Sequence, residues 1–227
     1  MTQTPGARRP GSDVHEPGTK RRGLVFMTTL TALAGYMDAV GYAQLSGLYV
    51  SFMSGNSARF GLQLADHESD GAVRSLTIIS AFVCGTAIAT SFTLRWGGMH
   101  SARILWMEAV LVLLGIGLMQ GGQGTAGFAL VAVGMGMQNI LHRAVSGVDA
   151  GKTFITGMLF DTGRALALLL AHRAEANELL VPLAGWGAFV SGVFAGGLML
   201  QAVPASFALL PACAVLVGAA LAAGLSR

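Results

Sequence analysis

The sequence predicts an all-α integral membrane protein with six transmembrane helices, two short broken or re-entrant segments, and two inverted repeats of about 100 residues. Three observations predict it: the composition, the spacing of the apolar segments and the distribution of basic residues. Of the 227 residues, 53% are hydrophobic and 11% are charged, and the mean hydropathy is +0.63. A chain this apolar cannot hide its side chains in one water-soluble core, so lipid must be part of its solvent.

Residues 1–22 are rich in Pro, Gly and charged residues and have no apolar period, so they are predicted to be a disordered cytoplasmic tail. Basic residues of this tail supply most of the formal net charge of +3 and stand just before the first apolar run. They indicate topology rather than a nucleic-acid site. Together with Ala32-Leu33-Ala34 they imitate a secretory signal with a cleavage site, but the apolar run continues to about Ala43, which argues against cleavage.

Eight apolar segments follow the tail. They cover residues 24–43, 51–65, 76–94, 104–119, 125–141, 153–171, 181–200 and 205–225. Most are close to the roughly 20 residues that cross a bilayer as a helix. Segments 51–65 and 153–171 are the weak members, because the first is short and carries Arg59 while the second carries Asp161 and Arg164.

Loop charges indicate whether the two weak segments cross. If all eight segments cross from a cytoplasmic N-terminus, two loop cations lie inside and four outside, contrary to the positive-inside rule. If the weak segments instead enter and return on the same side, five lie inside and only Arg74 lies outside, together with the acidic loop from Asp66 to Asp70. This comparison predicts six spans, with both termini in the cytoplasm.

The second half of the chain repeats the rhythm of the first. The run Ser51–Gly55 with Gly61 matches Thr153–Gly157 with Gly163 at a constant offset of 102 residues, and a looser match sets residues 35–38 against 135–138 at an offset of 100. Such similarity predicts two related units, residues 23–120 and 121–227, within one membrane domain. Because each unit has three spans, the second is inverted relative to the first, as in many channels and secondary transporters.

Ser54-Gly55-Asn56 and Thr156-Gly157 are the predicted helix breaks. Gly permits a turn, and a Ser or Thr hydroxyl can cap the half-helix that follows. Breaks of this kind survive in a membrane only where protein or a water-lined cavity surrounds them. Two half-helix N-termini that point at the midplane from opposite sides would offer positive dipole ends to a solute. The alternative is that both segments are amphipathic helices along the two interfaces.

Polar side chains inside the spans belong to the same candidate site. Asp38 lies about fifteen residues into the first span, and Gln138 and Asn139 take the corresponding place in the fifth. A carboxylate at a helix centre costs on the order of 3 kcal/mol, so it needs a partner or a function. We expect Asp38 to be the proton- or cation-sensitive element of a midplane site shared with Ser54 and Thr156; the alternative is a structural hydrogen bond to a neighbouring helix.

Arg59 and Asp161 occupy equivalent places, since the same offset of 102 residues separates them. Their opposite charges suggest a pair across the two units, with Arg164 left to face the cavity. The alternative is that each side chain snorkels to its own interface. The complete predicted substrate-binding set is Asp38, Ser54, Gly55, Asn56, Arg59, Gln138, Asn139, Thr156, Gly157, Asp161 and Arg164.

No catalytic, metal or cofactor site is predicted. The histidines form no ligand-spaced pair, and Cys84 and Cys213 each stand alone in an apolar segment. No GxxxxGK loop is present, so any transport would be passive or ion-coupled. Glu108, beside Trp106 and one turn inside the fourth apolar segment, is interpreted as an interfacial anchor.

Four motifs resemble the YoaK-like family of bacterial inner-membrane proteins, catalogued as a domain of unknown function. They are Gly35–Gly41, Phe52–Asn56, Gly134–Asn139 and Thr153–Gly157, and the resemblance extends over nearly the whole chain from about Gly23. The family usually has Thr where this chain has Ser54, a difference that keeps the hydroxyl. The resemblance implies a bacterial protein that spans the membrane several times, and it implies no activity.

The sequence therefore predicts a small-solute channel or an ion-coupled secondary transporter, not an enzyme. A non-transporting membrane scaffold or partner subunit is the alternative, favoured if the polar positions are fully paired. An intramembrane serine protease is disfavoured, because Phe52 replaces the Gly of its motif and no His lies in a span to act as a base. The predicted partners are the lipid bilayer and a small solute, without nucleic acid; the substrate, the coupling ion and homo-oligomer formation are left open.

Overall fold

A computed structural model describes residues 17–98, 100–146 and 154–225, with the side chains of 17–22, 142–146 and 154 outside the description. Within these ranges the chain is helical and contains no strand. The helices are α1 (Pro17–Gln44), α2 (Met53–Ala65), α3 (Ser69–Arg95), α4 (Ser101–Gln120), α5 (Gly124–Ser146), α6 (Phe154–Leu170), α7 (Ala176–Ala202), α8 (Ala205–Ala208) and α9 (Leu210–Leu225). The predicted all-α class is confirmed.

Six stretches of the described chain are long and apolar enough to cross a membrane. They are Gly23–Gln44, Ser69–Arg95, Ser101–Gln120, Gly124–Leu141, Ala176–Ala202 and Ala205–Leu225. The last joins the single turn α8 to α9, which has Pro211 at its second position, where a missing N–H disturbs the helix least. Helices α2 and α6, with 13 and 17 residues, correspond to the weak segments 51–65 and 153–171 and are not among these stretches.

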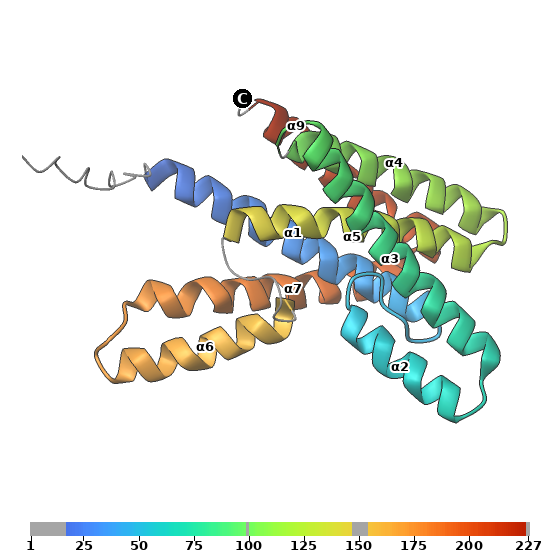
Figure 1. Ribbon diagram of the computed structural model, residues 1–227, viewed down its shortest axis with the longest axis horizontal. Helices are drawn as coiled ribbons and strands as arrows, with labels where there is room; N and C mark the ends of the chain where they lie inside the picture. The colour runs from blue at the N-terminus through green and yellow to red at the C-terminus, as the bar shows by residue number, and fades with distance from the viewer. Residues whose placement is uncertain (1–16, 99, 147–153, 226–227) are drawn as a thin grey trace, which may run out of the picture.

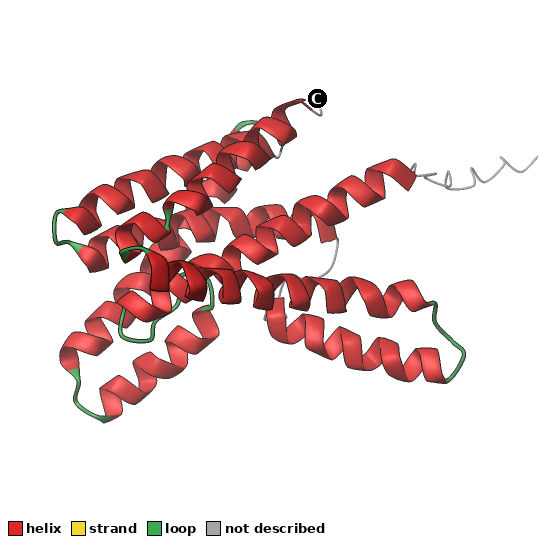
Figure 2. Cartoon of the chain, turned by 180° about the vertical axis from the view of Figure 1, so that it is seen from behind, coloured by secondary structure: helices red, strands yellow, loops and turns green. Residues whose placement is uncertain are grey.

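The six long stretches run alternately between two ends of the molecule (Figure 1). The first turns of α1 and the last turns of α9 lie toward the same end, as an even number of crossings requires. Figure 2 shows the short loops that close the helical hairpins. Helix α1 begins at Pro17, so residues 17–22, predicted as part of a disordered tail, are helical. Proline at a first helical position is pre-organised for the helix, and a span can extend its polar turns beyond the hydrocarbon.

Each long helix packs mainly against a helix from the other half of the chain. Helix α1 lies along α7, and α3 lies along α5. Glycines allow these helices to touch: a Cβ added at Gly35 or Gly192 would collide with a backbone carbonyl across the α1–α7 crossing, and one at Gly85 or Gly136 would do so across the α3–α5 crossing. Lipid is as apolar as the side chains, so close backbone packing of this kind stabilises membrane helices more than hydrophobicity does.

The two short helices begin halfway along their long neighbours. Near the end of α2, Gln63 accepts a hydrogen bond from Ser75 near the start of α3. Since α2 has 13 residues and α3 has 27, α2 reaches back only to about the middle of α3. Helix α6 packs against α7 in the same way, with the Met158 side chain against Gly185. In Figure 1 both start near the middle of the molecule and run toward opposite ends.

In the first half the break lies before the predicted motif Ser54-Gly55-Asn56 rather than within it. Residues Ser54, Gly55 and Asn56 form the first turn of α2, and Thr156 and Gly157 form that of α6. The N-cap residue of α2 is Phe52, which makes no side-chain capping bond. Capping of α2 by the Ser54 hydroxyl is therefore wrong, because the chain already turns in residues 45–52 and the helix has begun when Ser54 is reached.

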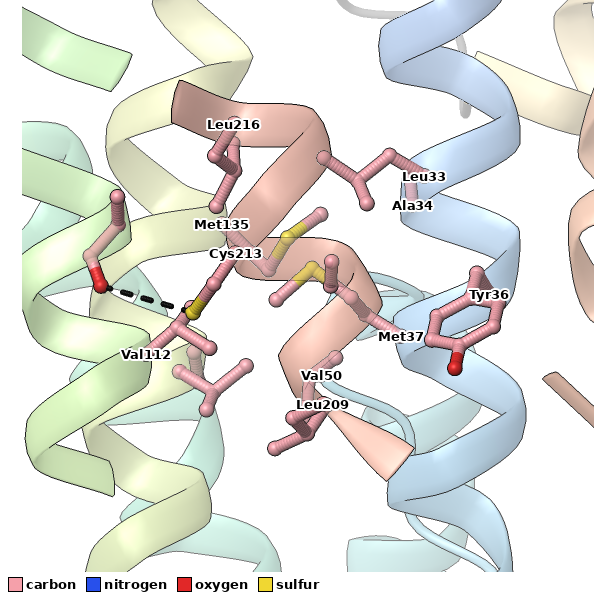
Figure 3. Close-up of a cluster of buried hydrophobic side chains, with 14 of the residues drawn as sticks. Leu33, Ala34, Tyr36, Met37, Val50, Val112, Met135, Leu209, Cys213 and Leu216 are labelled. Carbon is pink, nitrogen blue, oxygen red and sulfur yellow. Dashed lines mark hydrogen bonds between the residues drawn. The ribbon is translucent and has the colours of Figure 1, made fainter. Parts of the chain in front are cut away.

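The core lies where α9 enters between α1 and α4. Figure 3 shows Leu33 of α1, Val112 of α4 and Leu216 of α9 among the side chains that meet there. All three are buried, with Val112 and Leu216 fully enclosed. The Tyr36 hydroxyl donates a hydrogen bond to the Ala208 carbonyl and so ties α1 to α8. This junction places the middle of α1, and with it Asp38, inside the protein.

Candidate functional site

Asp38 holds the loop that leads into α2. Its Oδ1 accepts hydrogen bonds from the backbone N–H groups of Val50 at 2.8 Å and Ser51 at 2.7 Å. Its Oδ2 accepts the Ser51 hydroxyl at 2.6 Å. Only 1% of Asp38 is exposed. A carboxylate that receives several donors offsets part of its burial cost, and here it also orders the backbone immediately before a helix N-terminus.

Asn56 holds the same loop from the other side. Its Oδ1 accepts the N–H of Tyr49 at 2.8 Å, and its Nδ2 donates to the Tyr49 carbonyl at 2.7 Å. The amide thus pairs with both backbone groups of one residue, as a neighbouring strand would. Because Asn56 is fully buried, an exchange for an apolar side chain would leave both backbone groups without a partner.

Arg59 closes the turn at the start of the loop. Its guanidinium donates to the Ser46 carbonyl at 2.7 Å. Ser46 and Gly47 both have positive φ, 54° and 88°, and a Cβ at Gly47 would lie against the guanidinium. Glycine therefore suits this position for two reasons, backbone conformation and space. The Nε of Arg59 is buried without a hydrogen-bond partner.

Three predicted site residues, Asp38, Asn56 and Arg59, are thus brought together around residues 45–52. Sequence reasoning did not identify the loop residues that these side chains bond to, Ser51, Tyr49 and Ser46, because they lie outside any helix. The ordered loop can hold the start of α2 in a fixed position inside the protein. The equivalent segment of the second half includes residues 147–153, which lie outside the described residues.

The other predicted residues are more dispersed. Ser54 and Thr156 are exposed on the first turns of α2 and α6, and no described hydrogen bond joins either of them to Asp38. A Cβ added at Gly55 would meet the Phe52 ring, whereas Gly157 is half-buried. Asn139 is half-buried, and its amide reaches the Met135 carbonyl at 3.5 Å.

Arg59 and Asp161 do not pair. The guanidinium bonds to the Ser46 carbonyl instead, and the ion pair found among the described residues joins Arg74 to Glu68 at 3.8 Å on the surface. Asp161 is half-buried and Arg164 is exposed. The predicted pair is wrong because α2 and α6 run from the middle toward opposite ends, which carries residues in their second and third turns away from each other.

Glu108 lies deeper than its sequence position suggested. Helix α4 starts at Ser101, so Glu108 is two turns inside it, and none of its surface is exposed. Neither carboxylate oxygen has a hydrogen-bond partner. The interpretation as an interfacial anchor is therefore wrong. The signal that could have found it is a carboxylate between apolar residues on both sides, which is costly in lipid wherever it occurs.

Gln138 on α5 is also buried with an unsatisfied polar atom. It is 1% exposed, and its Nε2 has no hydrogen-bond partner. It lies one turn from Gly134, where an added Cβ would come within 2.9 Å of Glu108 Cγ. On the remaining side, the Cys213 thiol of α9 donates to the Ala109 carbonyl at 3.8 Å (Figure 3). Both carboxylate oxygens of Glu108 on α4 and the Nε2 of Gln138 on α5 are therefore buried without a hydrogen-bond partner, and α4 packs against both α5 and α9.

The fold and these two polar sites define a multi-pass α-helical membrane protein with six long apolar stretches and two carboxyl groups, Asp38 and Glu108, buried among the described residues. The chain belongs to the family described as protein of unknown function DUF1275, whose model matches residues 26–222. It is 27% identical over 177 residues to the UPF0700 transmembrane protein RA0705 of Rhizobium meliloti, covering 78% of this chain and 74% of that protein. This confirms the resemblance to the YoaK-like family.

A second relative carries the family's name. Over 90 residues the chain is 29% identical to the UPF0700 transmembrane protein YoaK of Bacillus subtilis, covering 40% of this chain and 38% of that protein. No solved structure matches. The names of both relatives describe transmembrane proteins and state no activity.

Proposed function

We propose that the protein is a small-solute channel or secondary transporter of the bacterial inner membrane, without enzymatic activity and with both termini in the cytoplasm. The observation that carries the proposal is a pair of matching helix crossings. Gly35 faces Phe189 and Gly192 faces Ala32 where α1 meets α7; Gly136 faces Phe82 and Gly85 faces Val133 where α5 meets α3.

These contacts are related by constant offsets. Ala32 and Gly35 precede Val133 and Gly136 by 101 residues, and Phe82 and Gly85 precede Phe189 and Gly192 by 107. The first helix of each half therefore meets the third helix of the other through equivalent residues. Such an exchange is what two repeats related by an axis in the membrane plane would produce, and transporters built in this way bind solute where the repeats meet.

The short helices support the same proposal. Helices α2 and α6 start near the middle and lead to opposite ends, so their N-terminal turns would face a common midplane region. Ser54 and Thr156 supply exposed hydroxyls there. The proposed solute site consists of these turns, Ser54-Gly55 and Thr156-Gly157, with the loop held by Asp38 and Asn56 as its support.

A membrane scaffold or partner subunit is the second candidate. It is favoured by the complete pairing of Asp38 and Asn56, whose oxygen and nitrogen atoms all have partners in the loop. Polar groups satisfied in this way serve structure and leave none of those atoms for a solute. The two candidates differ in whether water reaches the first turns of α2 and α6.

Thiol accessibility distinguishes them. Ser54→Cys and Thr156→Cys are made one at a time in a chain without Cys84 and Cys213, and an impermeant thiol reagent is applied from each side of oriented vesicles. Leu62→Cys and Leu159→Cys, exposed positions on the same two helices, are the matched controls facing lipid. A transporter predicts that positions 54 and 156 react while both controls do not. Failure of both test positions to react from either side contradicts a solute pathway and favours the scaffold.

A further inference from the structure

Two carboxylates are buried among the described residues of the spans, and their surroundings differ. Asp38 accepts hydrogen bonds from Val50 and Ser51. Glu108 is equally enclosed, yet both of its oxygens lack a partner. A lone ionised carboxylate in an apolar interior is too costly to persist, so Glu108 must be neutralised by something that binds to it.

We propose that Glu108 and Gln138 form a proton-binding site between α4, α5 and α9, with Glu108 as the group that takes up and releases the proton. The role of the proton as a coupling ion rests on the proposed transport function; the binding of a proton at this site does not. The geometry stands on buried atoms without a hydrogen-bond partner, both carboxylate oxygens of Glu108 and the Nε2 of Gln138. Their helices pack closely, because a Cβ added at Gly134, one turn from Gln138, would lie 2.9 Å from Glu108 Cγ.

The surroundings favour a proton over a metal cation. The described residues contain no group of three or more His, Cys, Asp or Glu side chains that could hold a metal ion. Hard cations need about six oxygen ligands, whereas a proton needs a single carboxyl oxygen. The titratable group that faces Glu108 from α9 is Cys213, while α8 brings none. On α5, the side chains of His142 and Arg143 lie outside the described residues.

Release of the proton breaks the carboxyl O–H bond, leaves the electron pair on Glu108 and transfers the proton to a water molecule. The resulting carboxylate needs a donor, and the unpartnered Nε2 of Gln138 is suited to supply it. In the present conformation Glu108 has no contact with solvent. Proton exchange with water therefore requires α4, α5 and α9 to separate around Glu108. Helices α4 and α5 stay together near the turn that joins them, where Gly115 lies close to Gly127.

Infrared spectroscopy tests the site without any solute. A carboxyl that is protonated at neutral pH has a carbonyl stretching band that ionised carboxylates lack, and the band shifts in D₂O. We expect this band in the unchanged protein in lipid nanodiscs and its loss in Glu108→Gln. The controls are Glu178→Gln, an exposed acid on α7, and Asp38→Asn, a buried acid with partners; both should keep the band. Absence of the band from the unchanged protein, or its persistence in Glu108→Gln, overturns the proposal.

Transport gives the second readout. For a solute identified by uptake into proteoliposomes, Glu108→Gln should lose accumulation driven by a proton gradient and keep solute exchange without a gradient, while Glu178→Gln keeps both. Retained proton-driven accumulation in Glu108→Gln overturns coupling through this site. If no solute is transported, the proposed function fails while the infrared band still decides the proton site. If Glu108→Gln does not fold, Glu108→Asp replaces it in the infrared experiment, and the carbonyl band is then expected at a shifted frequency.

Discussion

Gly192 on α7 lies directly against the backbone carbonyl of Ala32 on α1. The atoms that an added Cβ would meet are all backbone, so no flexible side chain can move aside. The contact fixes the depth at which the two helices cross. Gly85 stands in the same relation to Val133 at the crossing of α3 and α5.

The first prediction concerns this contact. Gly192→Ala should destabilise the protein by about 1–3 kcal/mol, the usual cost of inserting volume into a packed core. Gly197→Ala, on the same helix with open space around it, is the matched control and should be neutral or stabilising, because alanine suits a helix better than glycine. Thermal unfolding in detergent measures both. Equal stability of the two variants would show that α1 and α7 do not cross this closely.

The second prediction concerns Asp38 and Ser51. Asp38→Ala should cost more than about 2 kcal/mol, since two backbone N–H groups and one hydroxyl lose a common acceptor. Asp38→Asn should cost less, because its amide oxygen can still accept the backbone donors. Ser51→Ala should cost about 1 kcal/mol. A double-mutant cycle between Asp38→Ala and Ser51→Ala should show coupling of at least about 0.5 kcal/mol; strict additivity would contradict the bond.

The third prediction separates Arg59 from Asp161. Arg59→Ala should cost about 1 kcal/mol through loss of its bond to the Ser46 carbonyl. Asp161→Ala should have little effect. Because the two side chains share no partner, the double variant should equal the sum of the single variants within about 0.5 kcal/mol in chemical or thermal unfolding. A double variant markedly more stable than that sum would restore the ion pair predicted from the repeat.

The fourth prediction concerns orientation. His67→Cys in the turn between α2 and α3, and Gly98→Cys in the turn between α3 and α4, are each introduced into a chain without Cys84 and Cys213. Both positions are exposed. An impermeant thiol reagent added to intact cells should label position 67 and leave position 98 unlabelled until the membrane is opened, as the charge distribution requires. Labelling at position 98 in intact cells reverses the proposed orientation.

The amino-acid sequence by itself determined the extent of the two helices that the weak segments form. The apolar segments 51–65 and 153–171 correspond to α2 (Met53–Ala65) and α6 (Phe154–Leu170) within two residues at each end. This agreement has a simple cause. The thickness of a bilayer sets the length of a transmembrane helix, and the charges of the loops indicate which segments do not cross. Both properties depend on short stretches of sequence, so the sequence alone predicts them.

Sequence reasoning also identified Asp38, Asn56 and Arg59 as residues with a special role, because each is a polar group within or beside an apolar segment. It did not identify their partners. Ser51, Tyr49 and Ser46 offer mainly backbone groups, and a backbone group carries no signature in the sequence.

Only the tertiary structure decided which helix covers which. Glu108 is enclosed because α5 and α9 pack over that face of α4, and Gly192 is required because α1 crosses there. In a water-soluble protein the apolar face of each helix would have indicated its buried side. In a membrane the lipid is as apolar as the protein interior, so both faces of a span carry similar residues and the packing partners are set by the fit of backbones and small side chains.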